Sequence, residues 1–228
     1  SSKVRSSLGT GIRFPSLYDY SYGTVLKNKE DVKPEKSTSM DLGYETVFES
    51  IDTSLNLSVF RISYNDALTG WQSNTDTDGS TFVIKNADAT VVSKGVELSS
   101  LWKPKSDFNI GLNYNYNKSH AATDCDDPDV TEVLCIDDQQ IRVPQHAVST
   151  SINYQTKSKL KNSLLIKYVG ERRDYGIFSI NASADVILDD YITFDYKGSY
   201  NLYDSYNLYF SAKNLFDQNY EETWKYST

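Results

Sequence analysis

The sequence predicts an all-β fold that forms part of an antiparallel transmembrane β-barrel, with short turns at one end of the strands and long loops at the other. Three observations lead to this prediction. Apolar residues recur at every second position over long segments, short and long connections alternate along the chain, and many of the 18 tyrosines lie near segment ends. One apolar face, one polar face and aromatic borders are typical of outer-membrane barrels.

Nine segments carry a strand pattern, in some cases weakly. Their ranges are 3–12, 37–48, 51–65, 81–102 (a long or interrupted strand), 106–118, 146–155, 159–170, 190–202 and 205–214. Within 51–65 the apolar positions change parity between Val59 and Phe60, which predicts a β-bulge. Nine is an odd number, whereas bacterial single-chain barrels have even strand counts. We therefore expect the chain to be a piece of a larger barrel.

The alternation is clearest over residues 107–117. Its even positions are Phe108, Ile110, Leu112, Tyr114 and Tyr116. Its odd positions are aspartate, asparagine and glycine. Residues 191–202 and 206–212 repeat the pattern, as a strand with one apolar and one wet face does. The side chains expected to face lipid are Ile110, Leu112, Tyr196 and Phe210. Those expected to face the barrel interior or a plug are Asn113, Asp195 and Lys197.

The connections between the segments are of two kinds that alternate. Short turns lie near residues 49–50, 104–106, 156–158 and 203–204. Long polar segments lie at about 14–35, 65–81, 119–145 and 171–189. A soluble antiparallel sandwich is the alternative for an alternating pattern, but it gives no reason for all long loops to share one end. A barrel with short periplasmic turns and long extracellular loops does.

Composition excludes several other classes of protein. The 23 Lys and Arg residues face 31 Asp and Glu, a net charge of −8 that argues against a nucleic-acid partner. No apolar run is long enough for a membrane-spanning helix. The two histidines have no nucleophile at a useful spacing, and no glycine motif fits a phosphate-binding loop. We therefore expect neither an enzyme nor a cofactor.

Five segments resemble TonB-dependent outer-membrane receptors, in the order and spacing of that family. They are GTGIRFPSLYDYSYG at 9–23, DVKPEKSTSMDLGYE at 31–45, NADATVVSKGVELSSLW at 86–102, RVPQH at 142–146 and NLFDQNYEE at 214–222. The resemblance implies that residues 1–228 are the C-terminal part of a barrel of about 22 strands in the outer membrane of a Gram-negative bacterium. It also implies that the plug, the TonB box, the early strands and the last strand lie outside this sequence.

Two segments are similar to the cobalamin-receptor branch of that family. They are GERRDYGIFSINASADVILDDYITFDY at 170–196 and ETWKYST at 222–228. The resemblance implies TonB-dependent uptake of a scarce nutrient, cobalamin, with outer-membrane lipid and lipopolysaccharide, TonB (through the plug region) and the small ligand as partners. The alternatives are a ferric-siderophore or haem receptor of the same family, and a passive pore or adhesin barrel.

The longest loop holds the only two cysteines. Cys125 and Cys135 enclose nine residues and predict a disulfide in an exported chain, whereas a metal site would need more histidine or cysteine nearby. Seven acidic residues between 124 and 138 predict either a solvated loop or a contact with a divalent ion or ligand. The segment 74–80 imitates the start of an EF-hand, but Lys85 occupies the position where a bidentate glutamate is needed. We therefore assign no metal site.

Bulky residues at loop tips are the candidate ligand contacts. Trp71, Tyr175 and Phe178 lie in the expected outer loops, where the strand pattern does not require an aromatic residue. Aromatic residues are enriched in recognition sites. The alternative for each is packing against a neighbouring loop.

Overall fold

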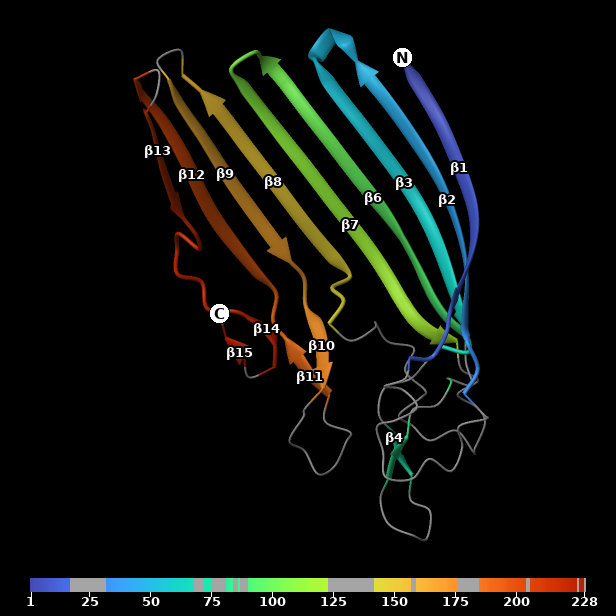
Figure 1. The fold of residues 1–228 in the computed structure, drawn as a ribbon. Coiled ribbons are helices and arrows are strands. Elements are labelled where there is room, and N and C mark those ends of the chain that lie inside the picture. The colour runs from blue at the N-terminus through green and yellow to red at the C-terminus, as the bar shows by residue number, and fades with distance from the viewer. Residues whose placement is uncertain are drawn as a thin grey trace.

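The structure, a computed structural model, describes residues 1–16, 32–67, 72–74, 81–83, 86, 90–122, 142–156, 159–175, 185–203, 206–224 and 226–227. One antiparallel sheet of nine strands dominates it (Figure 1). Its strands, in spatial order, are β1 (Ser2–Arg13), β2 (Glu35–Phe48), β3 (Thr53–Asn65), β6 (Thr90–Lys105), β7 (Phe108–Ala122), β8 (His146–Gln155), β9 (Leu160–Val169), β12 (Tyr191–Tyr203) and β13 (Tyr206–Ala212). The nine predicted strands are confirmed. The 81–102 segment is interrupted, because β5 (Thr81–Val83) is separate from β6.

Each strand of the sheet pairs with the strands before and after it in sequence, so the sheet is a meander. In Figure 1 the strand ends that are joined over few residues lie together at the top, and the strand ends that are joined over many residues lie together at the bottom. One short turn is η1 (Glu49–Ile51), which closes at Asp52 in a left-handed conformation with a φ of 47°. This arrangement confirms the prediction of short and long ends, so we refer to the periplasmic and extracellular ends of the sheet.

Strand register gives the sheet one apolar and one polar face. One row of paired residues crosses eight strands through Val4, Tyr44, Leu57, Leu98, Tyr114, Val148, Tyr168 and Ile192. The row displaced by one residue runs through Lys3, Glu45, Asn56, Ser99, Asn113, Ser149, Lys167 and Thr193. Successive side chains of a strand point to opposite faces, so the first row belongs to the outer face and the second to the inner face.

None of the described segments forms a layer over the apolar face. Leu8 and Phe210 are 75% and 47% exposed, and among the described residues the buried apolar side chains are Val92 and Leu188. The predicted lipid-facing residues Ile110, Leu112, Tyr196 and Phe210 all lie on this face. The predicted interior residues Asn113, Asp195 and Lys197 lie on the polar face. Large exposed apolar surface of this kind is the outer wall of a membrane barrel.

The predicted bulge in residues 51–65 is wrong. β3 pairs with β2 from Asn65 to Thr53, and with β6 from Tyr64 to Thr53, without a register shift. The apolar residues shift from odd to even positions because the outer face of the strand contacts lipid over only part of its length. Beyond Val59 the outer face carries Arg61, where the strand leaves the apolar band, while Phe60 turns to the inner face.

Phe60 covers Gly95 on the neighbouring strand. A Cβ at Gly95 would lie 2.7 Å from the Phe60 ring and would clash with the backbone oxygen of Tyr116. We expect Gly95→Ala to lower the free energy of unfolding of the full-length receptor by about 1–3 kcal/mol, because a backbone atom cannot move aside cheaply. Gly9→Ala is the matched control, since its Cβ would meet only the Ser39 hydroxyl at 3.1 Å. Equal loss of stability in both variants would contradict this account.

Six short strands lie outside the large sheet, and all of them except β5, which falls within the predicted segment 81–102, were not predicted from the sequence. β4 (Gln72–Asn74) pairs with β5, β10 (Arg172–Tyr175) with β11 (Asp185–Leu188), and β14 (Glu221–Thr223) with β15 (Tyr226–Ser227). All lie at the extracellular end of the sheet (Figure 1). Throughout the described ranges, no helix is both long and apolar enough to span a membrane.

Candidate functional site

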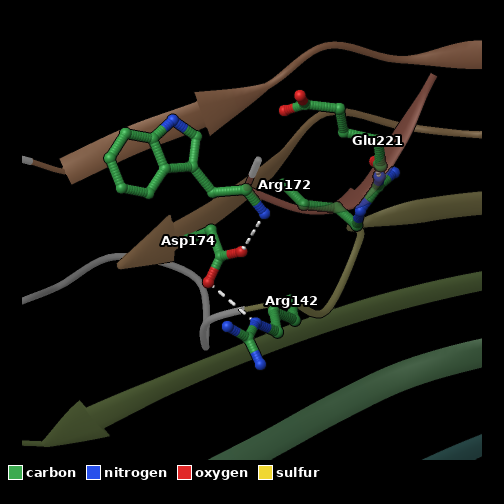
Figure 2. A network of polar contacts seen from close by, with 5 residues as sticks. Arg142, Arg172, Asp174 and Glu221 are labelled. Atoms are coloured by element: carbon green, nitrogen blue, oxygen red, sulfur yellow. Dashed lines mark hydrogen bonds and ion pairs between the residues drawn. The ribbon is translucent and has the colours of Figure 1, made fainter. Parts of the chain in front are cut away.

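A buried carboxylate joins three segments at the extracellular end of the sheet. Asp174 on β10 is fully buried, and its Oδ1 accepts a hydrogen bond of 2.7 Å from Nε of Arg142. Its Oδ2 accepts a second, also of 2.7 Å, from the backbone N–H of Trp224. Figure 2 shows both contacts converging on the carboxylate. Because each oxygen has a close donor, the desolvation cost of this charge is offset.

Arg172, two residues earlier on β10, links the same segments a second time. It is 5% exposed, and its guanidinium donates to the backbone oxygens of Gly170 at 3.2 Å and Glu221 at 2.6 Å. The guanidinium carbon also lies 5.2 Å from the centre of the Tyr191 ring, within range of a cation–π interaction. Tyr191 in turn stacks on Tyr220 with a ring-centre distance of 4.1 Å.

We call the cluster of Arg142, Arg172, Asp174, Glu221 and Trp224 the loop clamp (Figure 2). A backbone hydrogen bond of 2.8 Å from Arg142 N–H to the Arg173 oxygen reinforces it. The clamp ties residue 142 at the end of one expected outer loop to the β10–β11 hairpin and to the segment after β13. Its chemistry is structural, because the hydrogen bonds of Asp174 and Arg172 run to other parts of the chain.

The residues of the loop clamp come from three of the sequence motifs that resemble TonB-dependent receptors. Arg142 opens RVPQH, Arg172 and Asp174 belong to GERRD, and Glu221 lies in NLFDQNYEE. The three motifs are separate in the sequence, whereas the structure brings them into one cluster. Nothing in a single sequence pairs Asp174 with partners 32 and 50 residues away.

Asn86 makes a second link between outer segments. Its side-chain amide accepts from Lys33 N–H at 2.7 Å and donates to the Lys33 oxygen at 2.8 Å and to the Asp66 oxygen at 2.6 Å. These bonds join the start of the NADAT motif to the DVKPE motif. The loop ends on this side of the sheet are thus also held by specific hydrogen bonds.

The inner face is a concave polar wall. An open depression of about 500 Å³ is lined by side chains that include Arg5, Glu97, Asn113 and Lys167. Arg5 also forms an ion pair of 3.0 Å with Glu45. Amides, hydroxyls and charges of both signs suit hydrogen bonding to a polar occupant or to water. Among the described residues, no group of three His, Cys, Asp or Glu side chains could hold a metal ion.

Most of the predicted site residues are not tested by the structure. Tyr175 ends β10, where its backbone pairs with Asp185. Trp71, Phe178, Cys125 and Cys135 lie outside the described residues, as does the acidic segment 124–138. The ligand contacts, the disulfide and an ion contact at that segment therefore stay predictions. The loop clamp was not predicted.

Several solved structures are similar to this chain. The siderophore receptor PirA from Acinetobacter baumannii superposes with a TM-score of 0.72 at 17% identity, over 100% of this chain and 37% of its own. The pyoverdine outer membrane receptor FpvA from Pseudomonas aeruginosa PAO1, bound to pyoverdine, gives 0.72 at 14%, over 97% and 31%. The copper transporter OprC gives 0.71 at 16%, over 96% and 32%. The chain spans about a third of the length of these proteins, and at such identities the likeness concerns the fold.

A family model decides the assignment. The model described as "TonB dependent receptor-like, beta-barrel" matches residues 1–215. No curated protein sequence matches the chain. The match covers all nine strands of the sheet, and it agrees with the two-faced sheet and the distribution of short and long connections. The chain therefore belongs to the TonB-dependent receptor β-barrel family, whose members are transport proteins of the Gram-negative outer membrane.

Proposed function

We propose that the chain is the C-terminal part of a receptor barrel that takes up a scarce metal chelate by TonB-dependent transport. The main observation in support of this proposal is that the nine-stranded antiparallel sheet has one apolar face and one polar face. The apolar face suits lipid, the polar concave face suits a wet interior or a plug, and the outer loop segments are tied together at one end. Those segments offer a ligand a pre-organised surface.

The two edge strands of the sheet indicate that further strands are needed to close the barrel. β1 and β13 each pair on one side only within the described sheet. Open edges are not tolerated in hydrocarbon, because their N–H and C=O groups find no partner there. We propose that further strands complete a barrel of about 22 strands. We further propose that a plug domain carries the TonB contact.

The ligand class rests on two sources. The similar solved structures are named for a siderophore, pyoverdine and copper. The resemblance of residues 170–196 and 222–228 favours cobalamin. Arg172 and Asp174 of the first segment are engaged in the loop clamp, so their presence reflects loop anchoring and carries little ligand information. Cobalamin and ferric siderophores share the chemistry of a metal chelate, which is the class we assign.

Ligand binding to the full-length receptor tests this proposal. Cells that express the receptor would be offered labelled cobalamin, ferric siderophores, haem and copper, with and without a functional TonB. We expect saturable binding of one chelate in both strains and uptake only with TonB. Uptake that does not depend on TonB would favour a passive pore. Surface attachment without uptake of any of these ligands would favour an adhesin.

The candidate loop-tip aromatics give a sharper result once the ligand is known. We propose that Trp71, Tyr175 and Phe178 contact it, and we expect Trp71→Ala and Tyr175→Ala each to weaken affinity by more than about 1 kcal/mol, roughly fivefold. Tyr203→Ala is the matched control, because Tyr203 is an exposed tyrosine at the periplasmic end. Unchanged affinity in both loop variants would show that the ligand is bound by other residues of the receptor. Failed barrel assembly would indicate a packing role.

A further inference from the structure

The chain that follows β13 leaves the extended conformation but stays beside β12. Asn214 and Asp217 have φ angles of 49° and 51°, in the left-handed region that asparagine and aspartate tolerate. The Asn214 side chain closes a turn, because it donates to the Gln218 oxygen and accepts from the Gln218 N–H, both at 2.9 Å. We call residues 214–224 the strap, since they run from this turn to the loop clamp at the extracellular end of the sheet (Figure 1).

Three contacts hold the start of the strap on β12. The Asn214 N–H donates a hydrogen bond of 2.9 Å to Oδ1 of Asp195. The Leu215 N–H donates to the backbone oxygen of Phe194 at 2.8 Å. The Phe216 ring packs edge-on against the Phe194 ring, with a ring-centre distance of 4.9 Å. The strap is therefore anchored on both faces of the wall, because Asp195 belongs to the inner face and Phe194 to the outer face.

The other end of the strap is held at the loop clamp. The Tyr220 ring stacks on the Tyr191 ring of β12 at 4.1 Å. The Trp224 N–H donates to Oδ2 of the buried Asp174 at 2.7 Å. Each end of the strap thus has a carboxylate that accepts one of its backbone N–H groups, Asp195 at the start and Asp174 at the end.

The first of these carboxylates lies at mid-height in the wall. Asp195 pairs with Leu165 on β9, and the same row continues through Ser151 to Gly111 on β7. The apolar positions of β7 run from 108 to 116, and Leu112, in the middle of them, adjoins Gly111. An ionisable side chain and irregular backbone at membrane depth are tolerated where they face protein or a water-filled cavity. Asp195 therefore connects the barrel interior to the strap.

We infer that Asp195 is a positioning residue through which the barrel interior controls how firmly the outer segments are held. The strap is either docked on β12 or released from it, and both carboxylates favour the docked state. Two sites that bias the same two-state element are coupled, and the coupling is reciprocal. A change in the interior that displaces the Asp195 carboxylate therefore loosens the loop clamp. This coupling does not depend on which ligand the receptor takes up.

Hydrogen exchange of the full-length receptor in lipid vesicles tests the coupling. The variant is Asp195→Ala, which removes the acceptor of the Asn214 N–H and lies outside the loop clamp. We expect exchange at the Trp224 amide to become about 10-fold faster, within the usual range of coupling between two sites. Lys197→Ala is the matched control, because it removes a charged side chain from the same strand and face, and a lysine has no acceptor for a strap N–H. It should leave exchange at Trp224 unchanged.

The conservative variant separates the hydrogen bond from a general effect on the wall. Asp195→Asn keeps a side-chain oxygen that accepts the Asn214 N–H, so it should retain most of the protection of Trp224. Equal acceleration in Asp195→Asn and Asp195→Ala would overturn the inference, as would acceleration in Lys197→Ala. Acceleration confined to Asn214 in Asp195→Ala would also overturn it, because the two ends of the strap would then be independent.

A reciprocal measurement does not require any change at Asp195 and therefore remains decisive if Asp195→Ala fails to assemble. Asp174→Ala removes the acceptor at the other end of the strap. Because coupling is reciprocal, exchange at the Asn214 amide should become faster by the same factor of about 10. Unchanged exchange at Asn214 in this variant would overturn the inference.

Discussion

Leu112→Arg is expected to destabilise the full-length receptor by about 2–4 kcal/mol, the cost of a cation at the membrane midplane of a barrel. Leu112 lies near the middle of the apolar stretch of β7, opposite Ser100 on β6 and Thr150 on β8. An arginine there would face lipid instead of water, and the carboxylates of the described sheet all lie on the inner face. The measurement is equilibrium unfolding by guanidinium of the receptor folded into lipid vesicles.

The adjacent residue provides the control for this prediction. Asn113 lies opposite Ser99 and Ser149 on the polar inner face. Asn113→Arg places the same side chain one residue further along the same strand, in polar surroundings, and should cost less than about 1 kcal/mol. Equal losses at Leu112 and Asn113 would show that the two faces do not differ in solvent, which would contradict the assignment of the outer wall to lipid.

The sheet could be predicted from sequence because lipid enforces its register. A slip of one residue would turn the apolar row of Tyr114 toward the interior and the polar row of Asn113 toward lipid, so the period of two is strict where the strand is in the membrane. The pattern fails where that constraint ends. In β3 the positions beyond Val59 leave the apolar band, and Phe60 can then face inward without any bulge.

The extracellular segments could not be predicted because they do not have one side in lipid and the other in water, so their residues show no regular alternation of polarity. Arg172–Tyr175 is a strand of four residues with no alternation of polarity, and it is ordered by partners distant in sequence. The charged pair Arg172 and Asp174 beside Gly170 is the only local signal of a buried cluster. A single sequence does not reveal that Arg142 and the backbone of Trp224 complete it.

Asp174→Ala is expected to loosen these segments without unfolding the barrel. The change removes two charge-assisted hydrogen bonds and leaves the Trp224 N–H and the Arg142 guanidinium without their acceptor. Losing one partner of a buried charged pair typically costs about 3–5 kcal/mol, and the lower end applies because Arg142 is 45% exposed. Hydrogen exchange of the full-length receptor should therefore be about 100-fold faster at the Trp224 and Arg142 amides.

Two comparisons separate loop anchoring from a general effect of charge. Asp189→Ala removes a carboxylate that is exposed just after β11, and it should leave exchange at Trp224 unchanged. Exchange in β7 and β8 should be equal in both variants, because their pairing involves no clamp residue. Unaltered exchange at Trp224 in Asp174→Ala would show that the clamp does not hold the loops. Loss of protection throughout the sheet would show instead that the barrel itself needs the clamp, since anchoring alone affects only the segments that Asp174 joins.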